Sequence, residues 1–233
     1  MMSNPDFVKA AVMEGCGVHD KGQTSPQQVI NGLEHDTNAL HLVGGGSLQA
    51  FSAYFTKHII EKPEHLPVRV VAAGRNYSPV TLRHPGLLGC RQSSVIDGLI
   101  LYEDVDVQEK TLLHEVMVTM IEIYRHLGIH FQVVQYSAEH LYTHERAAIG
   151  VTMYSPHTGQ YHEVGRISLC GDYISRRLWT LCRKDKKSAS FVSMLHVRAC
   201  HTARLLGLLM ENCQEEDSTY SLPGCLQSAV DAF

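Results

Sequence analysis

The sequence predicts an α+β fold in which a mostly antiparallel sheet is flanked by helices. Segments rich in Val, Ile and Tyr recur along the chain, as in β-strands. Two of them, residues 148–155 and 160–168, are separated only by Pro-His-Thr-Gly, which is typical of a β-hairpin. Amphipathic segments with helical spacing lie between the strand-like segments. With 233 residues and 44% apolar composition, the chain can form a sizeable core.

The clearest helix is predicted over residues 111–128, where the apolar side chains keep helical spacing and Gly128 supplies a C-terminal stop. The side chains expected to point inward are Leu113, Val116, Met117, Met120, Ile121 and Tyr124. Before this helix, the polar, glycine-rich residues 1–38 predict loops with short elements. The segments between them predict a helix over 47–60 and strands over 68–77 and 94–102.

After the long helix, the pattern predicts a strand over 129–136, followed by the hairpin. The remaining expectations are a helix over 172–182, a charged turn over 184–187, a strand over 189–197 and a helix over 199–214. In the last helix, the leucine spacing predicts that Leu205, Leu208 and Leu209 face inward.

Composition and residue spacing disfavour several classes of site. The net charge of −4 gives no global positive field for nucleic acid. The basic cluster at residues 183–187 is interpreted as a solvated turn, with contact to RNA phosphates as the alternative. The seven cysteines form no CxxC pair and the fifteen histidines form no metal-ligand spacing, so we expect reduced thiols and no metal site. No apolar run of membrane-spanning length occurs.

Four segments, in order, resemble motifs of the class II seryl-tRNA synthetases. They are LHLVGGGS at 40–47, GLLGCRQSSVID at 86–97, YHEV with GDYISRR at 161–177, and ARLLGLLMENCQ at 203–214. The resemblance covers residues 40–214 and is nearest to the degenerate, mitochondrial synthetase-like proteins of insects. It implies a class II catalytic-domain fold over residues 40–233, preceded by an incomplete segment, residues 1–39, near motif 1. An N-terminally truncated chain is therefore expected.

The resemblance also assigns roles to three retained positions. Glu163 matches a metal-binding glutamate, and Arg204 matches the motif 3 arginine that grips the γ-phosphate. The alternative for Arg204 is a structural arginine. Asp97 stands where the family has a glutamate that helps to hold the substrate amino group.

Other positions depart from the family pattern, and they predict a degenerate site. Two serines replace an arginine that clamps phosphate and an aromatic ring that stacks on adenine, and serine offers neither a guanidinium nor a π-face. Two arginines replace small hydroxyl residues. We therefore hypothesise that Arg166 or Arg198 pairs with Glu163 or Asp97 and closes the pocket. The degenerate positions are Val43 and Ser47 for a threonine and a glutamate, Ser78 and Val80 in motif 2, Ser93 for the aromatic ring, and Arg166 and Arg198.

The resemblance and the degenerate positions together predict a non-catalytic binding or regulatory protein of mitochondrial translation. The expected partners are a second copy of the chain or a true seryl-tRNA synthetase, with tRNA(Ser) as a further candidate and no cofactor, metal or membrane. The alternative is an active serine–tRNA ligase that uses ATP and Mg²⁺, in which Arg75 replaces the motif 2 arginine. Localisation in mitochondria is implied by resemblance alone, because the start of the chain lacks the character of a transit peptide.

Overall fold

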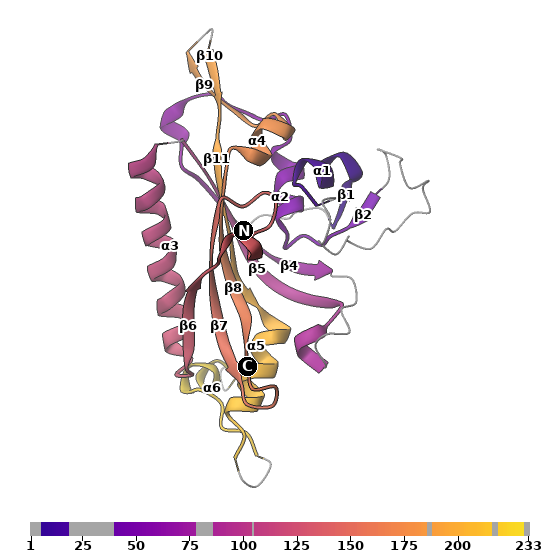
Figure 1. The fold of residues 1–233 in the computed structure, drawn as a ribbon, viewed down its shortest axis with the longest axis vertical. Coiled ribbons are helices and arrows are strands. Elements are labelled where there is room, and N and C mark those ends of the chain that lie inside the picture. The colour runs from indigo at the N-terminus through magenta and orange to yellow at the C-terminus, as the bar shows by residue number, and fades with distance from the viewer. Residues whose placement is uncertain are drawn as a thin grey trace.

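An antiparallel sheet of six strands organises the chain, in the order β4-β5-β11-β8-β7-β6 (Figure 1). The computed structural model describes residues 6–18, 40–77, 86–103, 105–185, 188–215 and 219–230. The strands of the large sheet are β4 (Val68–Tyr77), β5 (Gln92–Tyr102), β11 (Ser193–His201), β8 (Gln160–Gly171), β7 (Ala147–Ser155) and β6 (Phe131–Gln135).

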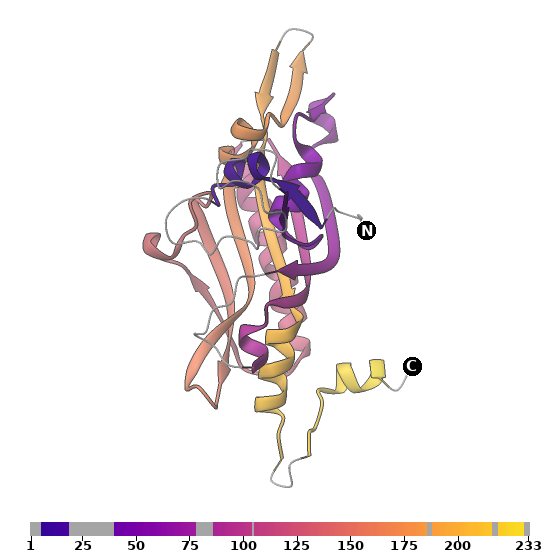
Figure 2. The same cartoon turned by 90° about the vertical axis from the view of Figure 1, so that its right-hand side faces the viewer.

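Two smaller sheets flank the large one. The first pairs β1 with β2 in antiparallel fashion. The second joins the β9–β10 hairpin, which projects from one end of the molecule (Figure 2), to β3. The bounds of these strands are β1 Phe7–Lys9, β2 Leu40–Leu42, β3 Ile59–Ile60, β9 Leu181–Asp185 and β10 Ser188–Phe191.

Helices cover both faces of the large sheet. The long helix α3 lies along one face, and α1, α2 and α4 gather on the opposite side near the β9–β10 end (Figure 1). The α-helices are α1 (Ala10–Gly15), α2 (Leu48–Phe55), α3 (Asp106–His126), α4 (Tyr173–Leu178), α5 (Thr202–Asn212) and α6 (Gly224–Val230). Short 3-10 turns are η1 (Pro63–His65), η2 (Gly86–Gly89) and η3 (Ala138–His140).

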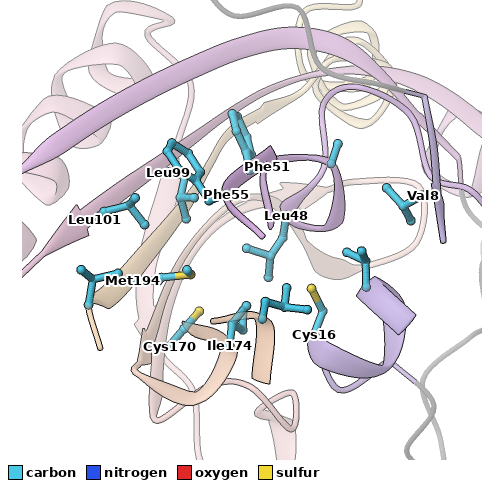
Figure 3. Packing of buried hydrophobic residues seen from close by; sticks show 14 of the residues in the cluster. Val8, Cys16, Leu48, Phe51, Phe55, Leu99, Leu101, Cys170, Ile174 and Met194 are labelled. Atoms are coloured by element: carbon cyan, nitrogen blue, oxygen red, sulfur yellow. The ribbon is translucent and has the colours of Figure 1, made fainter. Parts of the chain in front are cut away.

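The alternation of side chains along the strands divides the interior into two cores. In β5, Leu99 and Leu101 face α1, α2 and α4, whereas Ile100 and Tyr102 face α3. Figure 3 shows the first core, where α2, α4 and the strands contribute converging side chains. The residues labelled there are Val8, Cys16, Leu48, Phe51, Phe55, Leu99, Leu101, Cys170, Ile174 and Met194. The second core is closed by α3, whose Tyr124 donates a hydrogen bond to the carbonyl of Ala199 at 2.8 Å.

Most predicted elements are confirmed. The strand over 68–77 and the hairpin are as expected, and the long helix is present as α3, which begins at Asp106. Its inward face is confirmed in part: Leu112 is buried although it was not predicted, and Ile121 is only partly buried. Two predictions are wrong. The helix predicted over 172–182 ends at Leu178, because Trp179 adopts a left-handed conformation with φ of 58° and Leu181 begins β9.

The second wrong prediction is the single strand over 189–197, which is divided between β10 and β11 at Val192. Other expectations shift at their edges. The helix over 47–60 ends at Phe55, β9 extends into the charged turn as far as Asp185, and the helix over 199–214 is limited to Thr202–Asn212 because residues 199–201 belong to β11. The N-terminal segment contains the short elements β1 and α1, as expected.

Candidate functional site

A row of charged side chains crosses the sheet on the face that carries the first core. Arg198 of β11 lies opposite Asp97 of β5 on one side and opposite Arg166 of β8 on the other. Residues directly opposed in an antiparallel sheet point to the same face, so these three side chains are neighbours. Along the strands, this face therefore changes from the apolar core around Leu99 and Met194 to a charged row.

Asp97 is fully buried and has two partners. Arg198 donates from Nε to Oδ1 at 3.1 Å and from Nη2 to Oδ2 at 3.0 Å, and His196 Nε2 lies 3.0 Å from Oδ2. Burial alone would raise the pKa of Asp97, but the Arg198 guanidinium and the His196 ring outweigh it and lower that pKa. The carboxylate is therefore ionised and engaged on both oxygens.

Arg166 has a similar arrangement with two glutamates. It donates to Glu145 from Nε at 2.8 Å and from Nη2 at 2.6 Å, and to Glu163 from Nη1 at 2.9 Å. The Glu145 side chain is fully buried and also accepts a hydrogen bond from Ser168 Oγ at 2.5 Å. The pairing predicted from the sequence is thus confirmed twice, as Arg166–Glu163 and as Arg198–Asp97.

The glycine loop at residues 44–46 lies directly on β4. A Cβ atom at Gly74 would meet the backbone nitrogen of Gly46 at 2.8 Å, and Gly46 donates to the carbonyl of Arg75 at 3.1 Å. Val43, just before this loop, is buried in the first core. Val43, expected as a degenerate position, therefore contributes an apolar side chain to packing in the first core.

Ser47 caps the N-terminus of α2. Its Oγ accepts a hydrogen bond from the backbone nitrogen of Ala50 at 3.2 Å and donates to the carbonyl of Gly44 at 2.7 Å. We expect Ser47→Ala to lower the free energy of unfolding by about 1–2 kcal/mol, because both contacts are buried. Urea denaturation measures the change. Thr119→Ala, which removes an exposed hydroxyl from α3, is the matched control and should be near neutral.

Ser93 and His201 support the start of α5. Ser93 Oγ lies 3.2 Å from His201 Nδ1, and the backbone nitrogen of Arg204 lies 3.4 Å from the same ring atom. Burial, together with the nearby Arg204 and Arg198, lowers the pKa of His201 to about 4. The Arg204 side chain donates to the backbone carbonyl of Glu163 at 3.3 Å. This contact is of the kind expected if Arg204 is a structural arginine.

The degenerate positions Ser78 and Val80 lie outside the described residues.

The comparisons with known proteins agree with this fold. The sequence model of the tRNA synthetase class II core domain (G, H, P, S and T) matches residues 34–213. The chain belongs to this family. It is 28% identical to the mitochondrial serine–tRNA ligase of Mus musculus, over 97% of this chain and 43% of that protein. It is 26% identical to the serine–tRNA synthetase-like protein Slimp of Drosophila melanogaster, over 90% of this chain and 45% of that protein.

Among solved structures, cytoplasmic serine–tRNA ligase from Naegleria fowleri in complex with AMP matches with a TM-score of 0.85. Its sequence is 20% identical, and the match covers 100% of this chain and 54% of that one. Seryl-tRNA synthetase from Pyrococcus horikoshii complexed with ATP matches with a TM-score of 0.82 and 21% identity, over 97% of this chain and 49% of that one. The fold is therefore that of a seryl-tRNA synthetase catalytic domain, and the chain spans about half the length of these relatives.

Among the described residues, the glutamate matched to a metal ligand is already engaged by protein groups and does not fit a magnesium ion. Oε2 of Glu163, the position matched to a metal ligand, already accepts from Arg166 and, at 2.6 Å, from the hydroxyl of Tyr136. Within the described ranges, no group of three His, Cys, Asp or Glu side chains is arranged to hold a metal. Among the helices of the described residues, none has both the length and the apolar character of a membrane span.

Four groups at this site were missed from the sequence: His196, Tyr136, Tyr142 and Glu145. His196 stands two residues before Arg198 in β11, so the two-residue period of a strand could have placed both on one face. Glu145 and Tyr142 lie in the connection between β6 and β7, where no motif marks them. The fold places Glu145 and Tyr142 against Arg166, and the sequence alone does not indicate this.

Proposed function

We propose that the chain is a non-catalytic seryl-tRNA synthetase-like protein that acts as a binding or regulatory partner in mitochondrial translation. One observation carries the proposal: Asp97 and Glu163, matched to the amino-group and metal positions, are both paired with arginines of the same chain. An ammonium group or a magnesium ion would have to displace a charge-assisted contact at either carboxylate.

The two arginines oppose adenylate formation in a second way. The family has small hydroxyl residues at positions 166 and 198, and a guanidinium fills space intended for ligands. Joining a carboxylate to a phosphate also needs positive groups aimed at the developing charge. Here the charges of Arg166 and Arg198 are directed into Glu145, Glu163 and Asp97.

The test is a serine-dependent ATP–pyrophosphate exchange assay together with calorimetric titration of ATP and Mg²⁺. We expect exchange at the level of the blank and no magnesium-dependent binding of ATP in the micromolar range. The mouse mitochondrial ligase serves as a positive control. Detectable exchange above the blank would reject the proposal.

The proposed partner is a second copy of the chain or a seryl-tRNA synthetase of the same cell, and tRNA(Ser) is a further candidate. Support comes from the scaffold. Both hydrophobic cores are packed with buried side chains, although the residues at the family's ligand-binding positions have changed. The mitochondrial assignment is supported by the name of the mouse relative. Analytical ultracentrifugation of the chain, alone and mixed with the synthetase, tests the partner; no association in either sample would contradict it.

The second candidate function is that of an active serine–tRNA ligase. The names of the relatives favour it, since several are ligases. Arg75 is exposed near the end of β4 and adds a cation near motif 2. If the exchange assay gives a signal, Arg75→Ala decides whether this arginine supports it, because the signal should then fall.

A further inference from the structure

The guanidinium of Arg166 is surrounded by groups of the 136–146 segment, which connects β6 to β7. Its Cζ atom lies 4.4 Å from the ring centroid of Tyr136 and 4.6 Å from that of Tyr142. Nη2 also donates to the carbonyl of His140 at 3.1 Å. With Glu145, four residues of this segment contact one side chain on the sheet.

The chemistry of these contacts suits a planar cation. A guanidinium presents N–H donors in its plane and a flat face to an aromatic ring, whereas an ammonium is a compact point charge. Glu145 accepts two hydrogen bonds from the guanidinium, and Glu163 and the carbonyl of His140 accept one each. Two tyrosine rings add cation–π contacts.

The sheet itself is shaped for this arrangement. Gly150 of β7 lies opposite Arg166 in the register, and a Cβ atom there would meet the Tyr136 hydroxyl at 2.4 Å. Only a glycine lets the Tyr136 ring approach the strand so closely. At the other end of the segment, Glu145 accepts from the backbone nitrogen of Tyr142 at 2.9 Å, and Arg146 pairs with Glu109 of α3.

We infer that Tyr136, Tyr142, Glu145 and Glu163 form a guanidinium-binding cage that Arg166 fills from within the chain, and that this contact holds residues 136–146 against the charged row. The inference deepens the proposed non-catalytic function and rests on it, because both use the Arg166–Glu163 pair. Two carboxylates face one guanidinium, so removing Arg166 leaves an anionic, aromatic-lined site. The class of ligand for that site is a small planar cation.

Arg166→Ala should speed amide hydrogen exchange in residues 136–146 by about 10- to 100-fold, as expected for the loss of charge-assisted hydrogen bonds. Methylguanidinium at concentrations too low to denature should restore protection, and methylammonium at equal concentration should not. Arg69→Ala, which breaks an exposed pair with Glu115, is the matched control. It should leave exchange in this segment unchanged, with or without methylguanidinium.

Two further variants keep the test decisive if Arg166→Ala does not fold. Arg166→Lys retains the charge but not the planar fork, so the segment should exchange faster than in the wild type. Gly150→Ala should displace the Tyr136 ring and speed exchange in the same segment. The cage is rejected if lysine protects as well as arginine, if methylammonium restores protection equally, or if Arg166→Ala leaves exchange unchanged.

These outcomes are separate from those of the proposed function. The ATP titration and the exchange assay use the wild-type chain, whereas the cage is tested by protection of residues 136–146 in variants. Exchange above the blank by the wild type together with rescue by methylguanidinium would reject the non-catalytic function and keep the cage. Exchange at the level of the blank without rescue by methylguanidinium would keep the non-catalytic function and reject the cage.

Discussion

Arg198→Met is expected to lower the free energy of unfolding by about 3–5 kcal/mol, the range for breaking a buried ion pair by removing one partner. Methionine replaces the aliphatic stem of arginine and removes its charged guanidinium. Asp97 is fully buried and would keep only the His196 contact. The main cost is therefore that of a buried carboxylate left partly unpaired.

Urea denaturation at neutral pH measures this loss. Arg69→Met breaks an ion pair whose two side chains are each about half exposed, and it should cost less than about 1 kcal/mol. The double variant Asp97→Asn, Arg198→Met should recover part of the loss, because a neutral amide needs no counter-charge. A loss below about 1 kcal/mol for Arg198→Met would show that the buried pair does not stabilise the fold.

The sequence predicts those elements whose pattern has a single interpretation. Residues 68–77 and the hairpin keep strand character from end to end, and the long helix keeps its apolar face. The segment 189–197 shows no breaker, and its division at Val192 has a tertiary cause. The carbonyl of Val192 accepts a hydrogen bond from Ser175 of α4 at 2.6 Å, which turns the chain from the small sheet into the large one.

Contacts at the site could be predicted where both residues occupy positions of the family's motifs. Arg166 and Arg198 occupy positions with known neighbours in the family, so their pairing with Glu163 and Asp97 could be predicted. Glu145 could not, because it lies 21 residues from Arg166 in a connection whose course depends on the sheet. The burial of Val43 in the first core could not be read from its place beside the glycine loop, because it depends on the packing of that loop on the sheet.

The fold should also lose stability as the pH falls from about 6.5 to about 4, by about 3 kcal/mol for each of two buried histidines. Burial lowers the pKa of His144 to about 4, as it does for His201. A histidine whose pKa is lower in the folded state binds protons more weakly there than in the unfolded chain. Its contribution is therefore complete above the unfolded pKa and is lost as the pH falls toward the folded one.

Urea denaturation between pH 7 and pH 4 measures this slope. The double variant His144→Gln, His201→Asn should flatten it, because neither amide takes up a proton in that range. Asn at position 201 keeps a side-chain acceptor for the backbone nitrogen of Arg204. His114→Gln, at an exposed position of α3, is the matched control and should leave the slope unchanged.

The carboxylates of the site make a separable contribution at lower pH. The pKa values of Asp97 and Glu145 are both lowered, since their arginine partners outweigh burial. Their stabilisation is present above the unfolded values near 4 and is lost below them. A stability that stays flat from pH 6.5 to pH 4.5 and falls only below would contradict the role of the histidines and leave the ion pairs as the sole source of acid sensitivity.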